Sequence, residues 1–88
     1  MKVFKYEVST DFTLKLPEGY EVLSVMDQNN TPQMWIKVDD KAEADREVRF
    51  VAYGTVHDID EDLSLKFIGT FNTTHGMFVF HLFEVLED

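Results

Sequence analysis

Apolar and polar side chains alternate with a period of two residues along most of this 88-residue chain. In residues 12–16, for example, apolar side chains occupy positions 12, 14 and 16, and polar side chains lie between them. Successive side chains of a β-strand point to opposite faces, so this pattern predicts strands with one buried face. Alternation, or enrichment in aromatic and β-branched residues, marks the candidate strands at residues 2–8, 12–16, 21–26, 33–38, 47–53, 66–71 and 77–85.

Residues that favour turns separate these segments. Residues 17–19 combine a proline, which has a fixed φ, with a glycine, which tolerates a positive φ, so they predict a turn. Residues 27–32 form a second turn cluster, and residues 72–76 predict the loop of a hairpin between the last two strands. We therefore expect residues 1–88 to form a single all-β domain of six to seven mostly antiparallel strands, folded as a small sandwich or a partly open barrel.

Three segments depart from the simple alternation. Residues 39–46 are mostly charged and have no apolar stripe, which predicts a mobile loop rather than a helix. Residues 58–63 form an acidic connection, for which a helical turn and an irregular loop are both open. Residues 77–83 are apolar on both faces except for His81. Such a strand is expected at the centre of the fold, with a self-association surface as the alternative.

The chain is strongly acidic, with 17 acidic and 8 basic residues and a formal net charge of −9. This charge argues against direct binding to nucleic acid, which requires clustered lysine and arginine. No apolar run approaches the ~20 residues that span a bilayer, and the amino terminus lacks the apolar stretch of a signal peptide, so we expect no membrane partner. The absence of cysteine excludes disulfides and thiolate metal sites and fits a reducing, cytoplasmic setting.

Few side chains point to catalysis or to a cofactor. The four glycines are too far apart for a phosphate-binding loop, and no serine has the setting of a nucleophile, so we expect a protein without enzyme activity or cofactor. His57 with Asp58, Asp60 and Asp62 offers one nitrogen and several oxygens to a divalent ion, although a solvated surface histidine is the favoured interpretation. The aspartate spacing also resembles the start of a calcium loop, but the glycine and glutamate that such a loop needs at its sixth and twelfth positions are missing.

Acidic residues concentrate in two clusters, residues 39–47 and 58–62, which are either solvated loops or a surface that steers a basic partner. Trp35 and Tyr53 are candidate interface anchors, with burial in the core as the favoured alternative. The candidate partner-binding residues are therefore Trp35, Asp39, Asp40, Glu43, Asp45, Tyr53, His57, Asp58, Asp60, Glu61 and Asp62.

Several sequence blocks, spread over nearly the whole chain, carry a family resemblance. The most specific are Ile-Gly-Thr-Phe at residues 68–71 and Val-Phe-His-Leu-Phe-Glu at residues 79–84, supported by Leu-Pro-Glu-Gly at residues 16–19. Through these blocks the chain resembles a family of small bacteriophage and prophage proteins of uncharacterised function. It departs from the family pattern at Val56, where a second glycine is expected in a Gly-Thr-Gly-His turn. The resemblance implies a viral origin and no particular activity.

These observations predict a small acidic accessory protein of phage type that acts by binding another protein, for instance as an inhibitor of a host or competing-phage protein. We expect the partner to have a basic surface, because opposite charges steer the encounter. We expect the location to be the cytoplasm of an infected or lysogenic bacterium. Two alternatives stay open: a self-assembling structural component that forms a homo-oligomer, and a metal- or ligand-binding domain around His57 and the following aspartates.

Overall fold

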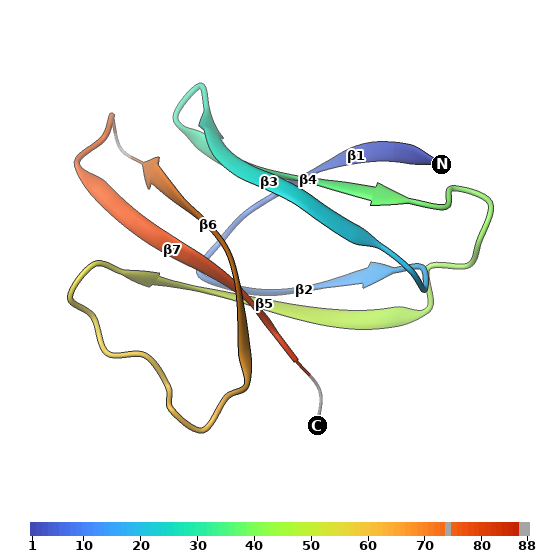
Figure 1. Cartoon of the computed structure of the whole chain (residues 1–88). Coiled ribbons are helices and arrows are strands. Elements are labelled where there is room, and N and C mark those ends of the chain that lie inside the picture. Colours follow the sequence, from blue (N-terminus) through green and yellow to red (C-terminus); the bar gives the residue numbers. More distant parts are fainter. Residues whose placement is uncertain (74, 87–88) are drawn as a thin grey trace.

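The computed structural model describes residues 1–73 and 75–86, and within these residues the chain forms seven strands and no helix (Figure 1). The strands are β1 (Lys2–Glu7), β2 (Asp11–Leu16), β3 (Glu21–Gln28), β4 (Thr31–Val38), β5 (Arg46–Gly54), β6 (Leu65–Thr73) and β7 (Phe78–Val85). The prediction of an all-β fold with six to seven strands is confirmed.

Two antiparallel sheets pack against each other, so the fold is a sandwich. Sheet A has the strand order β1-β4-β3, and sheet B has the order β2-β5-β7-β6. The chain passes from sheet A to sheet B at the corner between β1 and β2, where Val8 N donates to Pro32 O (3.0 Å) and Ala52 N donates to Thr10 O (2.9 Å). At the other side of the sandwich, β3 packs against β6. The sheets stay separate, and no closed barrel forms.

The core lies between the sheets and is built from the apolar side of each strand. Met34, Ile36 and Val38 of β4 are all buried, as the alternation predicts. Phe50 of β5 is fully buried and stacks on Phe12 of β2, with the ring centroids 5.3 Å apart. This burial fixes the strand register, because a slip of one residue would turn a whole apolar set toward solvent.

The turn between β3 and β4 is shorter than predicted. The cluster at residues 27–32 was expected to form the turn, but β3 continues to Gln28 and β4 begins at Thr31. Only Asn29 and Asn30 lie between the strands, with φ values of 53° and 64°. Two positive φ values are typical of a type I′ hairpin turn, and asparagine tolerates this conformation better than most residues.

Of the two other predicted turns, one connects strands of different sheets and the other connects neighbouring strands of one sheet. Residues 17–19 carry the chain from sheet B to sheet A, and Gly19 there has a positive φ of 82°. The hairpin predicted at residues 72–76 joins β6 and β7, and Thr73 pairs with Phe78 across it. Residue 74 of this loop lies outside the described residues.

The connection from β5 to β6 joins two parallel strands of the same sheet. Both strands are antiparallel to β7, which lies between them, so they are parallel to each other. The chain must therefore return along the sheet before β6 begins. Residues 55–64 do this as an irregular loop, seen below sheet B in Figure 1. The open alternative for residues 58–63 is thereby decided in favour of a loop.

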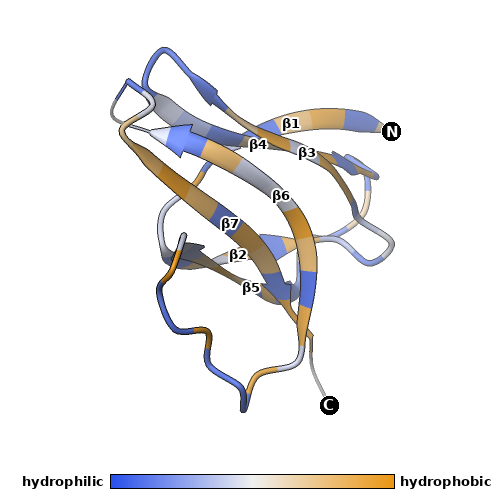
Figure 2. Cartoon of the chain, turned by 60° about the vertical axis from the view of Figure 1, so that its left-hand side comes forward, coloured by the Kyte–Doolittle hydropathy of each residue, from blue (hydrophilic) through white to orange (hydrophobic). Residues whose placement is uncertain are grey.

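Strand β7 is central, as expected from its apolar composition, because it pairs with β5 on one side and with β6 on the other. Phe80 and Leu82 of this strand contribute to the core. Side chains at the alternate positions, including His81 and Phe83, belong to the outer face of sheet B. Figure 2 shows β7 as hydrophobic along most of its length. The position of β7 pairs both of its edges and buries its inner face, but its outer face is left partly open, with Val79 37% exposed.

Candidate functional site

The outer face of sheet B carries a group of aromatic and apolar side chains. Phe83 of β7 lies at its centre, with Tyr53 of β5 and Phe67 of β6 packed edge-to-face at centroid distances of 6.0 and 5.6 Å. Phe67 is 57% exposed, and Val79 of β7 is 37% exposed. We call Tyr53, Phe67, Val79 and Phe83 the aromatic face. Exposed apolar groups of this kind mark interaction surfaces.

His81 lies on the same side of sheet B and is held by two threonines. Its Nε2 atom is 2.9 Å from Oγ1 of Thr55, and its Nδ1 atom is 2.9 Å from Oγ1 of Thr70. A hydroxyl group both donates and accepts, so both ring nitrogens have suitable partners whichever one carries the proton. The arrangement fixes the end of β5 to β7 and β6, which is a structural role.

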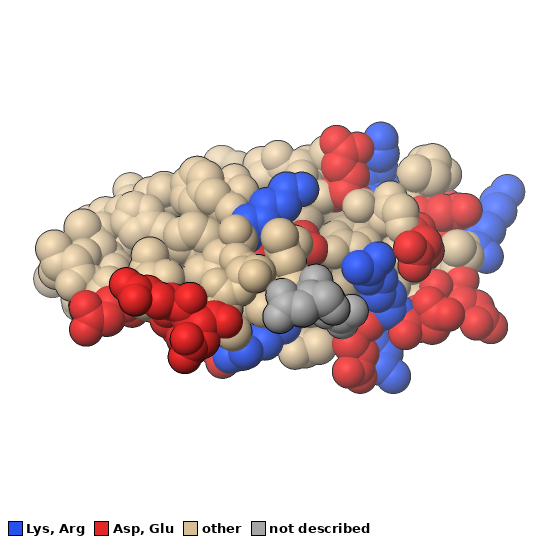
Figure 3. Space-filling view, turned by 60° about the horizontal axis from the view of Figure 1, so that its bottom comes forward, with Lys and Arg blue, Asp and Glu red and all other residues tan. Residues whose placement is uncertain are grey.

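The loop at residues 55–64, which we call the acidic loop, borders the aromatic face. Figure 3 shows its carboxylates as a group at the margin of a wide area without charged side chains. The four carboxylates at positions 58, 60, 61 and 62 form no ion pair with any residue that the structure describes. The pKa of Arg49 on β5 is raised mainly by the hydrogen bond to Asp11 and by the Asp11 charge. The charge of Asp60 adds to this effect.

The acidic loop begins with a strained turn. His57 N donates to Gly54 O over 3.0 Å, which closes the turn, and Val56 has a φ of 66°. A positive φ at this position is typical of a type II turn and favours glycine, whereas a β-branched residue is strained there. Val56 is 96% exposed, so its side chain gains no packing that would offset the strain. The His57 ring lies against Gly54, where an added Cβ atom would be 2.7 Å from Nδ1.

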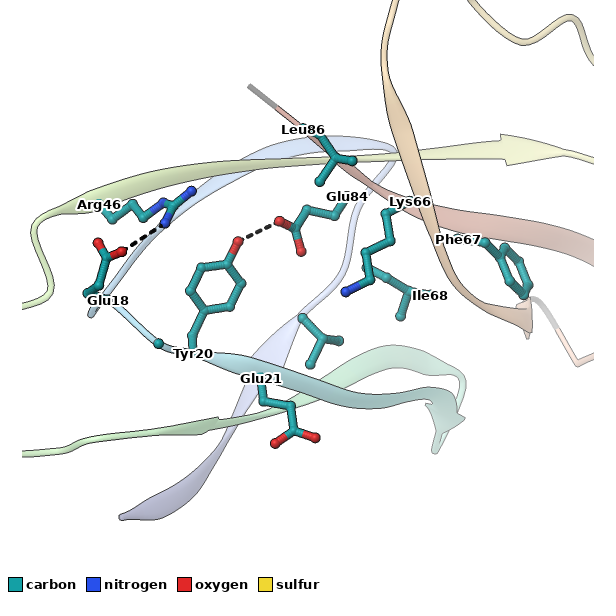
Figure 4. A pocket seen from close by; sticks show the side chains of 11 residues that line it. Glu18, Tyr20, Glu21, Arg46, Lys66, Phe67, Ile68, Glu84 and Leu86 are labelled. Atoms are coloured by element: carbon teal, nitrogen blue, oxygen red, sulfur yellow. Dashed lines mark hydrogen bonds and ion pairs between the residues drawn. The ribbon is translucent and has the colours of Figure 1, made fainter. Parts of the chain in front are cut away.

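A pocket of about 500 Å³ opens elsewhere, at the end of the sandwich where β3, β5 and β6 begin and β7 ends (Figure 4). Its lining comes from both sheets and includes Tyr20, Val22, Arg46, Lys66, Ile68, Glu84 and Leu86. A volume of this size lies within the range of small-molecule sites.

Glu84 places a carboxyl group at the inner side of this pocket. The residue is only 8% exposed, and it lies opposite Phe50 of β5 and Lys66 of β6. Burying a carboxyl group is costly unless hydrogen bonds replace those made to water. The Tyr20 hydroxyl supplies one such bond and donates to Oε2 of Glu84 over 2.5 Å. Because Tyr20 immediately precedes β3, this bond ties sheet A to sheet B.

The two basic residues of the pocket differ in their partners. The Arg46 guanidinium lies 5.8 Å from the centre of the Tyr20 ring, and its Nη1 atom is 3.4 Å from Oε1 of Glu18. The Lys66 ammonium points into the pocket in Figure 4. Within residues 1–73 and 75–86, no ion pair or hydrogen bond joins it to another side chain. The pocket therefore contains a buried carboxyl group and an unpaired ammonium group.

Comparison with known proteins identifies the family of the chain. A family of domains of unknown function, DUF7352, matches residues 1–88. The chain belongs to this family. No curated protein and no solved structure matches this DUF7352 domain. Because the family description assigns no activity, the function has to be argued from the site.

The DUF7352 fold separates the two aromatic candidates predicted from the sequence. Trp35 alternates with the buried positions of β4 and thus lies on the outer face of sheet A, whereas Tyr53 lies on the outer face of sheet B. Both are partly exposed and neither belongs to the core cluster, so the favoured expectation of core burial is wrong. The pattern misled because each strand has apolar side chains on both faces.

The two acidic clusters are also apart, in Figure 1 and in Figure 2 alike. In the first cluster, Asp40 binds the amino terminus and Lys2 at 3.3 Å each, and the Asp39 side chain accepts a hydrogen bond from Lys41 N at 3.1 Å. Glu43 and Asp45 are exposed. The first cluster is thus a loop tied partly to the chain itself, in contrast to the acidic loop.

The metal-binding alternative finds no ready ligand set. In the part of the chain that the structure describes, no three histidine, aspartate or glutamate side chains converge as metal ligands. His57 and the aspartates that follow it are close in sequence but are spread along an extended loop. For the same described residues, no helix has the length and apolar character needed to cross a membrane.

The sequence reasoning missed the pocket residues Tyr20, Lys66 and Glu84. A signal for Glu84 was present, because it shares the alternation of Phe80 and Leu82 and thus places a carboxyl group at an inward position. No comparable signal existed for Tyr20, which lies outside the strands, in the connection between β2 and β3.

Proposed function

We propose that this DUF7352 domain is a non-enzymatic accessory protein of bacteriophage type that binds a basic protein of the host or of a virus in the bacterial cytoplasm and thereby inhibits it. The proposed binding surface consists of the aromatic face and the acidic loop. One observation carries the proposal: the exposed Phe67 and the partly exposed Tyr53 and Phe83 lie on the sheet face that is bordered by four carboxylates without an ion-pair partner among the described residues.

The aromatic face supports binding because it is already ordered in the free protein. Phe83 contacts both Tyr53 and Phe67 through edge-to-face packing, which restricts the rotamers of all three rings. Binding then costs less side-chain entropy than it would for freely rotating side chains. Large aromatic groups of this kind often supply most of the binding energy of a protein interface.

The acidic loop supports a partner of stated chemistry. Its unpaired carboxylates and the net charge of −9 attract a surface that carries lysine and arginine. The partner that fits has apolar side chains for the aromatic face and basic side chains at the margin for residues 58–62. Trp35 and the cluster at residues 39–47 are left out of the proposed surface, because they lie on other parts of the sandwich.

The proposal is tested by selecting from a library of displayed random peptides on the purified domain. We expect the selected peptides to combine basic with apolar residues and to bind more weakly as salt increases. In nuclear magnetic resonance titrations of such a peptide, amide signals of β6, β7 and residues 55–64 should shift. Selection of acidic or uniformly polar peptides, or shifts confined to sheet A, would contradict the proposal.

Two variants with equal charge changes provide a matched control. One replaces Asp58, Asp60 and Asp62 by asparagine, and the other makes the same kind of change in the first cluster by Asp39→Asn, Glu43→Gln and Asp45→Asn. We expect only the first variant to weaken peptide binding, by about tenfold. An equal loss in both variants would mean that net charge alone acts and would remove the acidic loop from the interface.

The assembly alternative is decided by sedimentation of the domain alone and of its Phe67→Ala variant. Phe67 is exposed, so the substitution should leave the fold intact. We expect a monomer in both cases and weaker peptide binding by the variant. A homodimer that the substitution abolishes would assign the aromatic face to a second copy of the chain and overturn the proposal.

A further inference from the structure

We propose that the pocket between Tyr20, Lys66 and Glu84 binds a small zwitterion of the α-amino acid class. The pocket lies at the end of the sandwich, and Phe67 is the one residue of the aromatic face that also lines it. The argument below does not use Phe67 or the acidic loop, so this inference does not depend on the proposed function. It rests on the placement of one negative and one positive group that the protein itself leaves unpaired with each other.

The negative group is the Glu84 carboxylate. Tyr20 donates to Oε2, and no residue in the described part of the chain donates to Oε1. Oε1 is not fully enclosed by the protein and is therefore open to a donor in the pocket, where a charged donor is favoured because hydrogen bonds to ionised groups are stronger than those between neutral groups. An ammonium group of a ligand fits this position.

The positive group is the Lys66 ammonium. Lys66 and Glu84 are direct neighbours across β6 and β7, yet no ion pair joins them. The carboxylate turns toward Tyr20, while the ammonium points into the pocket beside Ile68 (Figure 4). The two charges thus form no ion pair with each other, and both line the pocket, where a ligand that carries an anionic and a cationic group can contact each of them.

The other charged residues of the pocket do not compete for the ligand. Glu21 binds Lys37 at 3.1 Å, and Glu18 binds Arg46 at 3.4 Å, so both carboxylates already have partners. A plain carboxylic acid would leave Glu84 without a charged donor, and a plain amine would leave Lys66 without an anion. A zwitterion satisfies both groups.

The remaining walls fit the side chain of an amino acid. Val22, Ile68 and Leu86 give the pocket an apolar part, next to the charged part. The volume of about 500 Å³ accommodates a free amino acid with an apolar or aromatic side chain. An extended peptide would have a blocked amino or carboxyl group at every internal residue and would lose one of the two charge contacts.

Ligand-detected nuclear magnetic resonance with the twenty L-amino acids, one at a time, tests the inference. We expect at least one apolar amino acid to bind with a dissociation constant in the low-millimolar range or tighter. The N-acetyl derivative and the carboxamide derivative of that amino acid should each bind about tenfold or more weakly, because each lacks one charge. The inference is overturned if no amino acid binds, or if both derivatives bind as well as the parent compound.

Two variants locate the binding. Lys66→Met removes an exposed ammonium and should weaken binding by about tenfold, whereas Lys15→Met makes the same change on the outer face of β2 and should have no effect. Glu84→Gln keeps an acceptor for the Tyr20 hydroxyl and should also weaken binding, whereas Glu61→Gln in the acidic loop should not. Because Lys66 is exposed, Lys66→Met tests the site even if Glu84→Gln fails to fold. Unchanged binding by Lys66→Met would refute the assignment.

Discussion

The two ends of the sandwich differ in how they use their charges. At the polar end, where β1, β3 and β5 begin, charged side chains crowd together and pair within the chain, as in Arg46–Glu18, Lys37–Glu21 and Lys2–Asp40. At the apolar end, where β5 stops and β7 begins, three apolar side chains are exposed: Val56 (96%), Met77 (75%) and Phe78 (54%). Figure 3 shows this contrast, apart from the acidic loop, which lies at the margin of the uncharged half.

Apart from the pocket at the polar end, the difference separates groups that are bonded within the chain from groups that are available for binding. The polar end joins its elements through side chains, above all through the bond from Tyr20 to Glu84. The apolar end joins them through tight backbone turns, in which Asn29, Asn30 and Val56 have positive φ values, and through a hydrogen bond from His75 N to Oδ1 of Asn30 at 2.8 Å. Charges that are paired within the chain already have partners, whereas the carboxylates of the acidic loop and the exposed apolar groups are free to contact another protein.

The largest effect is expected at the polar end, from Tyr20→Phe. This variant leaves the buried Glu84 carboxyl group without the tyrosine donor, and a hydrogen bond to such a group contributes about 1.5–3 kcal/mol. The free energy of unfolding, measured by urea denaturation, should fall by that amount. Tyr53→Phe on the aromatic face is the control and should change it by less than about 0.5 kcal/mol. Equal effects of both variants would contradict the importance of the sheet-to-sheet bond.

An effect of the opposite sign is expected at the apolar end, from Val56→Gly. Glycine adopts the φ of 66° without strain, which relieves about 1–2 kcal/mol, while its greater freedom in the unfolded chain costs about 0.5–1 kcal/mol. The net result should be a gain in stability of up to about 1.5 kcal/mol. Asn29→Gly, at a φ of 53°, should gain less, because asparagine already tolerates this conformation. A loss of stability in Val56→Gly would mean that the valine side chain has a packing role.

The smallest effect is expected from the exposed ion pair between Asp11 and Arg49. Arg49 donates to both carboxylate oxygens of Asp11 at 3.0 and 2.9 Å. This hydrogen bond, opposed by slight desolvation and aided by the arginine charge, lowers the pKa of Asp11 below its ordinary value of 3.8. The stabilisation is therefore present above that ordinary value and is lost as the pH falls through the lowered pKa.

Unfolding of the Asp11→Asn variant at two pH values checks this assignment. At neutral pH the variant should be less stable than the parent protein, by less than the change expected for Tyr20→Phe, because exposed ion pairs contribute little. In strong acid, where Asp11 is protonated, the difference should vanish. A difference that persists unchanged in acid would show that the substitution acts through something other than the charge.

Most of the fold followed from local patterns. Phe12 and Phe50 lie at inward positions of their strands because the alternation of side chains is a property of any strand, whatever its neighbours. The turn at residues 17–19 was equally predictable, because proline fixes φ at position 17 and glycine tolerates the positive φ at position 19. The turn predicted at residues 27–32 was longer than the observed turn, because Asn29 and Asn30 alone are enough to reverse the chain.

Much less of the candidate sites was predictable. Tyr53 was named as an anchor, but its neighbours Phe67 and Phe83 were not, because they meet only once β7 has inserted between β5 and β6. The acidic residues 58–62 were recognised, yet only the route of the loop along sheet B brings them to the aromatic face. The pocket was not foreseen at all.

The sequence by itself determined the strands, their inward sides and most of the turns, because these depend on backbone geometry and on the properties of adjacent residues. The tertiary structure decided which strands are neighbours, which charges are paired and where a pocket opens. The bond between Tyr20 and Glu84 joins residues 64 positions apart in the chain. Such contacts depend on how two sheets pack, and the periodicity of a single strand contains no information about that packing.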